Sequence, residues 1–171
     1  MSPSQPPLQV TPLYLACQEK QESLARLLLE AGADTNIAAH LERSDGSVET
    51  VSPLFWAASR GLEAVCSLLL DRGARLDLGR SPLHEAAWEG EVAVCRLLLD
   101  RGADIDLLED GVTPFYRAAE DGKESVCSLL LDRGATLELG KSPLEMIGLR
   151  QNIRKIIIEQ RSEELKWSIV H

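Results

Sequence analysis

The sequence lacks the features of a membrane-spanning, secreted or nucleic-acid-binding protein. It contains no run of about 18 apolar residues, the length that a membrane-spanning helix requires. It does not begin with a basic segment followed by an apolar one, so we expect no secretory signal. Lys and Arg number 18 against 27 Asp and Glu, which gives a formal net charge of −9. Because nucleic acids and anionic membranes attract basic patches, we expect neither as a partner.

Motifs of catalysis and metal binding are also missing. The chain has no HExxH, CxxC or GxSxG sequence and no glycine-rich phosphate loop. Its Asp-Gly pairs, at Asp45, Asp110 and Asp121, have the composition of turns. A calcium loop would instead place oxygen ligands at alternate positions over about twelve residues. We therefore predict that the protein is not an enzyme and uses no cofactor or metal.

What the chain does contain is one unit repeated along its length. The unit is clearest at residues 81–104, SPLHEAAWEGEVAVCRLLLDRGAD. Its opening recurs as TPLYLAC at 11, SPLFWAA at 52, TPFYRAA at 113 and SPLEMIG at 142. In four copies the opening residue and the closing glycine are 21 positions apart: Thr11 and Gly32, Ser52 and Gly73, Ser81 and Gly102, Thr113 and Gly134. A fixed period of this kind predicts a stack of similar units.

Each unit predicts a pair of helices. Ser81 can cap the first helix with its hydroxyl, and a proline follows at the first helical position, where no N–H is needed. The Ala86-Ala87 pair is small enough for another helix to approach closely, and Gly90 favours a tight turn. The second helix is apolar on most sides, so neighbouring units must cover it. No single unit is therefore expected to be stable alone.

These motifs resemble the ankyrin repeat. The resemblance rests on [S/T]-P-[L/F]-x-x-A-[A/C], on a glycine at 61, 90 and 122, and on L-L-L-[D/E]-x-G-A at 27–33, 68–74, 97–103 and 129–135. It implies an all-α repeat solenoid, an ankyrin-type helix-turn-helix stack whose units are joined by β-hairpin or turn fingers. We expect an irregular lead-in over 1–10 and one domain over 11–171. Its repeats would span about 11–51, 52–80, 81–112, 113–141 and 142–171, the last one degenerate.

The two end repeats are expected to be caps. The first lacks the turn glycine at Lys20 and carries the polar run 18–22, as a repeat with one face in water requires. The last loses the Ala pair, and its second helix, from Ile153 to about Trp167, is rich in charge.

The fingers differ in length. The distances from a closing glycine to the next opening residue are 20, 8, 11 and 8 residues. The two short fingers, LDLGR and LELGK, should turn tightly at Gly79 and Gly140. The long finger, 36–51, has Asp45-Gly46 near its middle and alternating residues after it, which predicts a hairpin with strands near 37–43 and 48–51. The alternative is an irregular surface insertion.

Cysteine spacing follows the repeat. Cys66, Cys95 and Cys127 are 29 and 32 residues apart and hold equivalent places in the second helix. Stacked copies would put them about 10 Å apart, beyond the reach of a disulfide. We expect these three and Cys17 to be small buried apolar residues in their reduced form. Reduced thiols favour a cytoplasmic or nuclear location.

The resemblance also indicates a binding surface. In the family, the exposed positions of the first helices line a concave groove; Leu15, Gln18 and Glu19 hold them in the first copy. His84 holds the position that the family uses for hydrogen bonds between repeats. The candidate partner-binding residues are Trp56, Ser59, Arg60, Glu85, Trp88, Glu89, Arg117, Glu120 and Asp121. The repeat does not require tryptophan at 56 or 88, so these two are the candidate hot spot. Alternatively, both merely cover neighbouring helices.

The sequence thus predicts a monomeric, non-catalytic protein-protein interaction module that binds a partner protein or peptide through this groove. Arg60 and Arg117 would take carboxylates of the partner. The groove's acidic residues favour a partner with basic groups beside an apolar anchor. One alternative is a methyl-lysine peptide reader, in which Trp56, Glu85, Trp88 and Glu89 form a cation–π cage. Another is a structural or designed repeat scaffold with no ligand of its own.

Overall fold

The computed structural model describes residues 10–42, 45–137, 139–141, 153–159 and 162. Its helices follow one another in pairs along the chain. They are α1 (Pro12–Gln18), α2 (Glu22–Glu30), α3 (Pro53–Ser59), α4 (Glu63–Asp71), α5 (Pro82–Glu89), α6 (Val92–Asp100), α7 (Pro114–Glu120) and α8 (Glu124–Asp132). A further helical segment covers 153–159. The SPLEMIG segment and the end of the expected cap helix lie outside the described residues.

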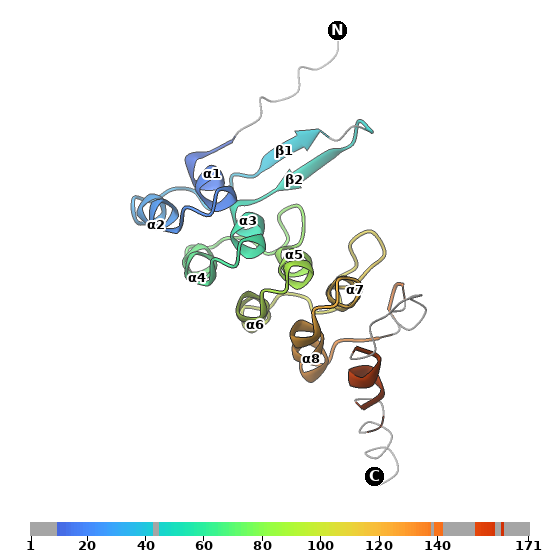
Figure 1. The fold of residues 1–171 in the computed structure, drawn as a ribbon. Helices are drawn as coiled ribbons and strands as arrows, with labels where there is room; N and C mark the ends of the chain where they lie inside the picture. The colour runs from blue at the N-terminus through green and yellow to red at the C-terminus, as the bar shows by residue number, and fades with distance from the viewer. Residues whose placement is uncertain (1–9, 43–44, 138, 142–152, 160–161, 163–171) are drawn as a thin grey trace.

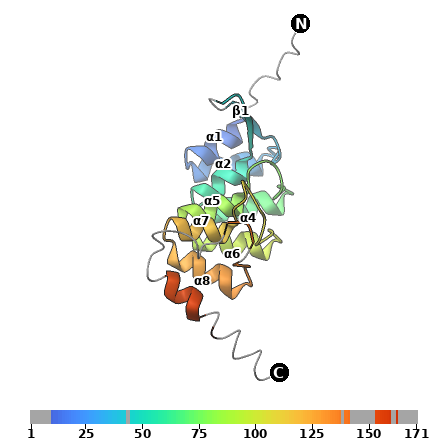
Figure 2. The same ribbon diagram turned by 90° about the vertical axis from the view of Figure 1, so that its right-hand side faces the viewer.

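The helix pairs stack in two parallel rows (Figures 1 and 2). One row holds α1, α3, α5 and α7, and the other holds α2, α4, α6 and α8 (Figure 1). Each helix contacts the next helix of its own row and the other helix of its pair. The expected ankyrin-type helix-turn-helix stack is confirmed.

The start of each first helix confirms the expected capping. The hydroxyls of Thr11, Ser52, Ser81 and Thr113 accept hydrogen bonds of 3.1–3.4 Å from the backbone N–H three residues later. Such a bond satisfies an N–H that has no partner within the helix. Gly90 ends α5 with a left-handed φ of 88°, whereas Lys20 adopts a left-handed φ of 55° at the corresponding turn after α1.

One apolar core runs the length of the stack. The alanine pairs of α3, α5 and α7 are buried within it, together with leucines of the second helices. Cys17, Cys66, Cys95 and Cys127 are free and buried, as expected. Burial raises the pKa of Cys17, Cys95 and Cys127 to about 12 and that of Cys66 further still. The thiols are therefore protonated at neutral pH and unreactive.

The long finger is an ordered hairpin, which confirms that prediction. Strand β1 (Ala39–Glu42) pairs antiparallel with β2 (Val48–Val51), and Ala39 lies opposite Val51. The first strand starts two residues later than expected. A small cluster of buried side chains at the base of the hairpin attaches it to the stack: Tyr14, Ala39, Val51 and Phe55.

Each short finger rests on the finger before it. The backbone N–H of Arg80 donates to the carbonyl of Thr50 at 2.9 Å, and that of Lys141 to the carbonyl of Gly111 at 3.0 Å. Gly79 and Gly140 have φ values of 73° and 68°, and a Cβ on either would clash with the same carbonyl oxygens. The tight turns expected at these glycines are confirmed, and they form because a neighbouring backbone passes very close.

The expected polar cap at the first repeat is only partly right. Residues 19–22 are exposed as expected. However, the outer face of α2 also carries two strongly exposed leucines, Leu24 and Leu27, with 42% and 62% of their surface accessible. The end of the stack is therefore apolar at this helix.

Candidate functional site

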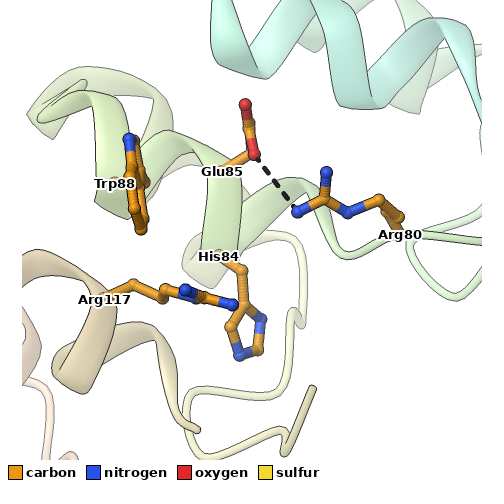
Figure 3. A pocket seen from close by; sticks show the side chains of 5 residues that line it. All are labelled: Arg80, His84, Glu85, Trp88 and Arg117. Carbon is orange, nitrogen blue, oxygen red and sulfur yellow. Dashed lines mark ion pairs between the residues drawn. The ribbon is translucent and has the colours of Figure 1, made fainter. Parts of the chain in front are cut away.

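The candidate binding residues lie along the row of first helices. We call the side chains of α3, α5 and α7 that reach the surface, together with Arg80, the first-helix surface. It contains an open pocket of about 290 Å³ at its centre. The pocket is lined by Arg80, His84, Glu85, Trp88 and Arg117 (Figure 3).

Trp88 is the exposed aromatic residue of this pocket. It lies near the C-terminal end of α5, with 39% of its surface accessible. The guanidinium carbon of Arg117, on α7, lies 5.3 Å from the centre of the indole ring (Figure 3). This cation–π contact holds the arginine against the ring and leaves the rest of the ring open to a ligand.

Trp56 has a different environment. It is half-buried and packs edge-on against Tyr14 at 6.3 Å and Phe55 at 5.4 Å between ring centres. Its indole N–H is buried, and Arg60 covers the ring at 5.4 Å. Trp56 does not line the pocket that contains Trp88. Its contacts therefore match the alternative in which this tryptophan covers neighbouring helices.

Arg80 connects three parts of the chain at the edge of the pocket. Its Nε lies 2.8 Å from Glu49 of β2 and 3.9 Å from Glu109 of the third finger, and its Nη2 lies 3.7 Å from Glu85. The guanidinium also lies 4.9 Å from the ring centre of Phe55. The repeat motifs do not mark Arg80 as a site residue. The signal was the short second finger, which leaves residue 80 directly before the cap of α5.

His84 forms the floor of the pocket and links two repeats. Its Nε2 lies 3.0 Å from the carbonyl oxygen of Val112, so Nε2 carries the proton and donates it. This confirms the expected hydrogen bond between repeats. Burial lowers the pKa of His84, and the charges of Arg117 and Arg80 lower it further, while the Val112 bond and Glu109 oppose the shift. The ring is therefore neutral at neutral pH.

Glu85 is the acidic group of the pocket. Burial raises its pKa above the ordinary value, although Arg80 and the hydroxyl of Ser59, which donates at 3.3 Å, act in the opposite direction. Ser59 itself is buried, with only 7% of its surface accessible. The expectation that Ser59 is exposed to a partner is wrong, because Glu85 of the next repeat covers it.

The remaining candidates form an acidic edge beside the pocket. Glu89, Glu120 and Asp121 are exposed at or just beyond the C-terminal ends of α5 and α7. Arg117 lies 3.6 Å from Glu120, and Lys123 lies 2.7 Å from Asp121. In the neighbouring repeat, Arg60 is exposed and donates from Nε to the carbonyl of Gln18 at 2.9 Å.

The surroundings of Trp56 and Trp88 also bear on the methyl-lysine alternative. Each of the two indoles already has an arginine of this chain over its ring, and the two do not share a pocket. Neither arrangement favours a methyl-lysine cage.

Over the residues that the structure describes, no three of His, Cys, Asp and Glu gather as a metal site would require. Over the same residues, every helix is too short or too polar to cross a membrane.

Comparison with known protein families gives an independent result. A model described as "Ankyrin repeats (3 copies)" matches residues 37–109, and one described as "Ankyrin repeat" matches residues 9–40. Together the two models cover more than half of the chain. None of the curated proteins matches it significantly. Ankyrin repeats in general are protein-protein interaction modules and typically are not enzymes. The chain belongs to the ankyrin repeat family.

Proposed function

We propose that this chain is a non-catalytic module that binds a partner protein or peptide across its first-helix surface, with Trp88 as the main anchor. The observation that carries the proposal is the exposed indole of Trp88 at the mouth of an open pocket, held beside Arg117. Tryptophan and arginine dominate the residues on which protein binding depends. Trp56 contributes by supporting the surface, because its half-buried ring makes edge-on contacts with Tyr14 and Phe55.

The charges around the pocket support a partner with basic groups near an apolar side chain. Glu89, Glu120 and Asp121 lie exposed at one edge, and the charge of Arg80 is already balanced by surrounding carboxylates. A basic group of the partner would gain from this edge while its apolar side chain covers Trp88. Arg60, whose Nε donates to Gln18, and Arg117, which lies 3.6 Å from Glu120, would take carboxylates of the partner through their remaining N–H groups. The buried, protonated thiols fit a reducing compartment, the cytoplasm or the nucleus.

Peptide display on the whole protein tests the proposal. Peptides selected from a random library would be titrated by calorimetry against the native protein and against Trp88→Ala. We expect Trp88→Ala to weaken binding at least about 30-fold, since truncation of such an anchor typically costs about 2 kcal/mol or more. A matched control is Ile158→Ala, which removes an exposed apolar side chain from the helical segment 153–159, away from this surface.

Two outcomes would contradict the proposal. Unchanged affinity in Trp88→Ala, with an unchanged circular dichroism spectrum, would exclude Trp88 as the anchor. Failure to select any specific peptide, together with failure to retain any specific partner from cell extract, would instead favour a scaffold without its own ligand.

A further inference from the structure

The outer face of α2 is apolar where the corresponding faces of the other second helices are covered. Leu24 precedes the L-L-L motif by three residues, as Val65, Val94 and Val126 do in α4, α6 and α8. These valines have at most 1% of their surface accessible, whereas Leu24 is 42% exposed. Leu27, 62% exposed, corresponds to Leu68, Leu97 and Leu129, which are half-buried or buried. The difference therefore lies in the surroundings, because the residue types are alike.

Neighbouring repeats explain the difference. Helices α4, α6 and α8 each contact the second helix of the repeat before them. In the part of the chain that the structure describes, α1 and α2 form the first layer and no helix pair precedes them (Figure 1). Leu24 and Leu27 therefore occupy stacking positions against which no helix pair among the described residues packs. Apolar side chains at such positions normally lie against another helix pair.

The turn after α2 also lacks an arginine that the corresponding turns after α6 and α8 carry. Arg101 pairs with Asp71 of the preceding repeat at 2.9 Å, and Arg133 pairs with Asp100 at 2.8 Å. These pairs link successive repeats along the edge of the stack. Ala31 stands where Arg101 and Arg133 stand in their repeats. The outer face of the first repeat thus offers apolar contact and has no arginine with which to continue the series of ion pairs.

We propose that the outer face of α2, around Leu24 and Leu27, is a docking surface for an ankyrin-type helix pair carried by a partner protein. The face continues the interface by which repeats of this chain pack on one another, so a helix pair of the same kind fits it. That helix pair would present apolar side chains and would need no aspartate opposite Ala31. The inference concerns the end of the stack and does not depend on the pocket around Trp88.

A second copy of this chain, packed symmetrically through its own Leu24 and Leu27, is a less suitable occupant. Two molecules with a net charge of −9 repel each other. Stable interfaces bury about 800 Å² on each partner, far more than two leucine side chains supply. A repeat stacked in register would, in contrast, cover the whole of α2 and α1.

The test adds a helix pair to the full chain. A second copy of residues 81–112 is inserted between Val10 and Thr11, where Thr11 takes the place of Thr113 and preserves the repeat frame. The added substitution Leu24→Cys then shows whether the outer face of α2 is covered. Only the introduced thiol is expected to react, because the native thiols are buried and protonated. We expect one cooperative guanidinium transition with a larger m value, and at least tenfold slower labelling of the introduced thiol by a maleimide.

The matched control carries the same insertion together with Leu24→Glu and Leu27→Glu, and should lose the single cooperative transition. Separate unfolding of the added unit, or unchanged labelling at position 24, would overturn the proposal. A dimer of the native chain in ultracentrifugation that Leu27→Glu dissociates would assign the face to a second copy instead. Faster labelling after deletion of residues 1–9 would assign it to the chain's own lead-in. Either of these two results also overturns the proposal.

Discussion

The Nε atom of Arg80 lies 2.8 Å from a carboxylate oxygen of Glu49, although the two residues are 31 positions apart in the sequence. The contact joins the short second finger to the long hairpin. Both side chains are largely buried, and Glu85 and Glu109 lie within 4 Å of the same guanidinium. Arg80 is therefore the positive charge that allows three carboxylates, from the long hairpin, from α5 and from the third finger, to lie close together.

We predict that Arg80→Met destabilises the fold by about 2 kcal/mol at pH 7. The substitution keeps the apolar stem but leaves the three carboxylates facing one another without a counter-ion, and breaking a partly buried ion pair has an effect of this order. The loss of stability caused by Arg80→Met should be smaller at pH 5, because protonation of a carboxylate relieves the repulsion. Urea unfolding of both proteins at the two pH values measures it.

Arg75→Met is the matched control for Arg80→Met. Arg75 pairs with Asp77 at 3.0 Å, but both side chains are more than half exposed. Exposed pairs of this kind are screened by solvent and contribute little to stability. Equal effects of the two substitutions would show that the network around Arg80 does not stabilise the stack.

Substitution of Gly79 tests the contact between the short finger and the hairpin. An alanine Cβ at Gly79 would collide with the carbonyl of Thr50, whereas a Cβ at Gly73 meets nothing within 4 Å. Both glycines have a positive φ, so each substitution carries the left-handed penalty of roughly 1–2 kcal/mol. We expect Gly73→Ala to lower the free energy of unfolding by this left-handed penalty alone. Gly79→Ala should lower it by about 3 kcal/mol, because steric overlap adds to the penalty. Similar midpoints in chemical denaturation would contradict the close approach.

Local sequence signals were sufficient to predict the helices and the hairpin. A Ser or Thr before a proline fixes the start of each first helix, and the Asp45-Gly46 turn predicts the strands on either side. The polar cap was predicted less well. Residues 19–22 are exposed, but Leu24 and Leu27 follow the same pattern as covered residues of inner repeats. Their exposure depends on whether another helix pair packs against α2, and the repeat pattern does not specify this.

The candidate site also has features that the repeat pattern does not predict. Trp56 and Trp88 do not hold equivalent positions, since Trp56 aligns with Glu85 and Trp88 aligns with Ser59. Trp56 packs inward because Tyr14 and Phe55 supply aromatic rings on both sides. Arg80 was missed because its importance comes from carboxylates on three separate segments. Such contacts arise from the packing of one repeat on the next.

Lys20 provides a test of backbone strain. It adopts a φ of 55° at a turn where Gly61, Gly90 and Gly122 have φ values of 69°, 88° and 72°. A residue with a Cβ is disfavoured in this conformation by roughly 1–2 kcal/mol, while glycine loses more chain entropy on folding. We predict that Lys20→Gly stabilises the protein by about 0.5–1 kcal/mol in thermal or chemical unfolding. Lys20→Ala is the control and should bring no such gain, because alanine retains the Cβ.

His84 is almost fully buried and donates from Nε2 to the carbonyl of Val112. Its pKa in the folded protein lies below the ordinary value of 6.5, chiefly because burial disfavours the charged ring. The unfolded chain therefore binds a proton that the folded chain does not, in the window from pH 6.5 down to the lowered pKa. Stability should fall as the pH drops through this window, by up to about 1.4 kcal/mol per pH unit.

Urea unfolding at pH 7.5, 6.5 and 5.5 measures this slope. His84→Gln should flatten the curve, because the amide group can still donate to Val112 but does not titrate. His40 is an exposed histidine whose Nδ1 lies 3.0 Å from the hydroxyl of Thr50, so His40→Gln controls for a general effect of losing an imidazole. If His40→Gln changed the slope as much as His84→Gln, the acid sensitivity would not originate at the buried ring. If neither changed it, groups other than these two histidines would have to account for the pH dependence. Glu85, whose pKa is raised, acts in the opposite sense, because its protonation at lower pH removes an unfavourable buried charge.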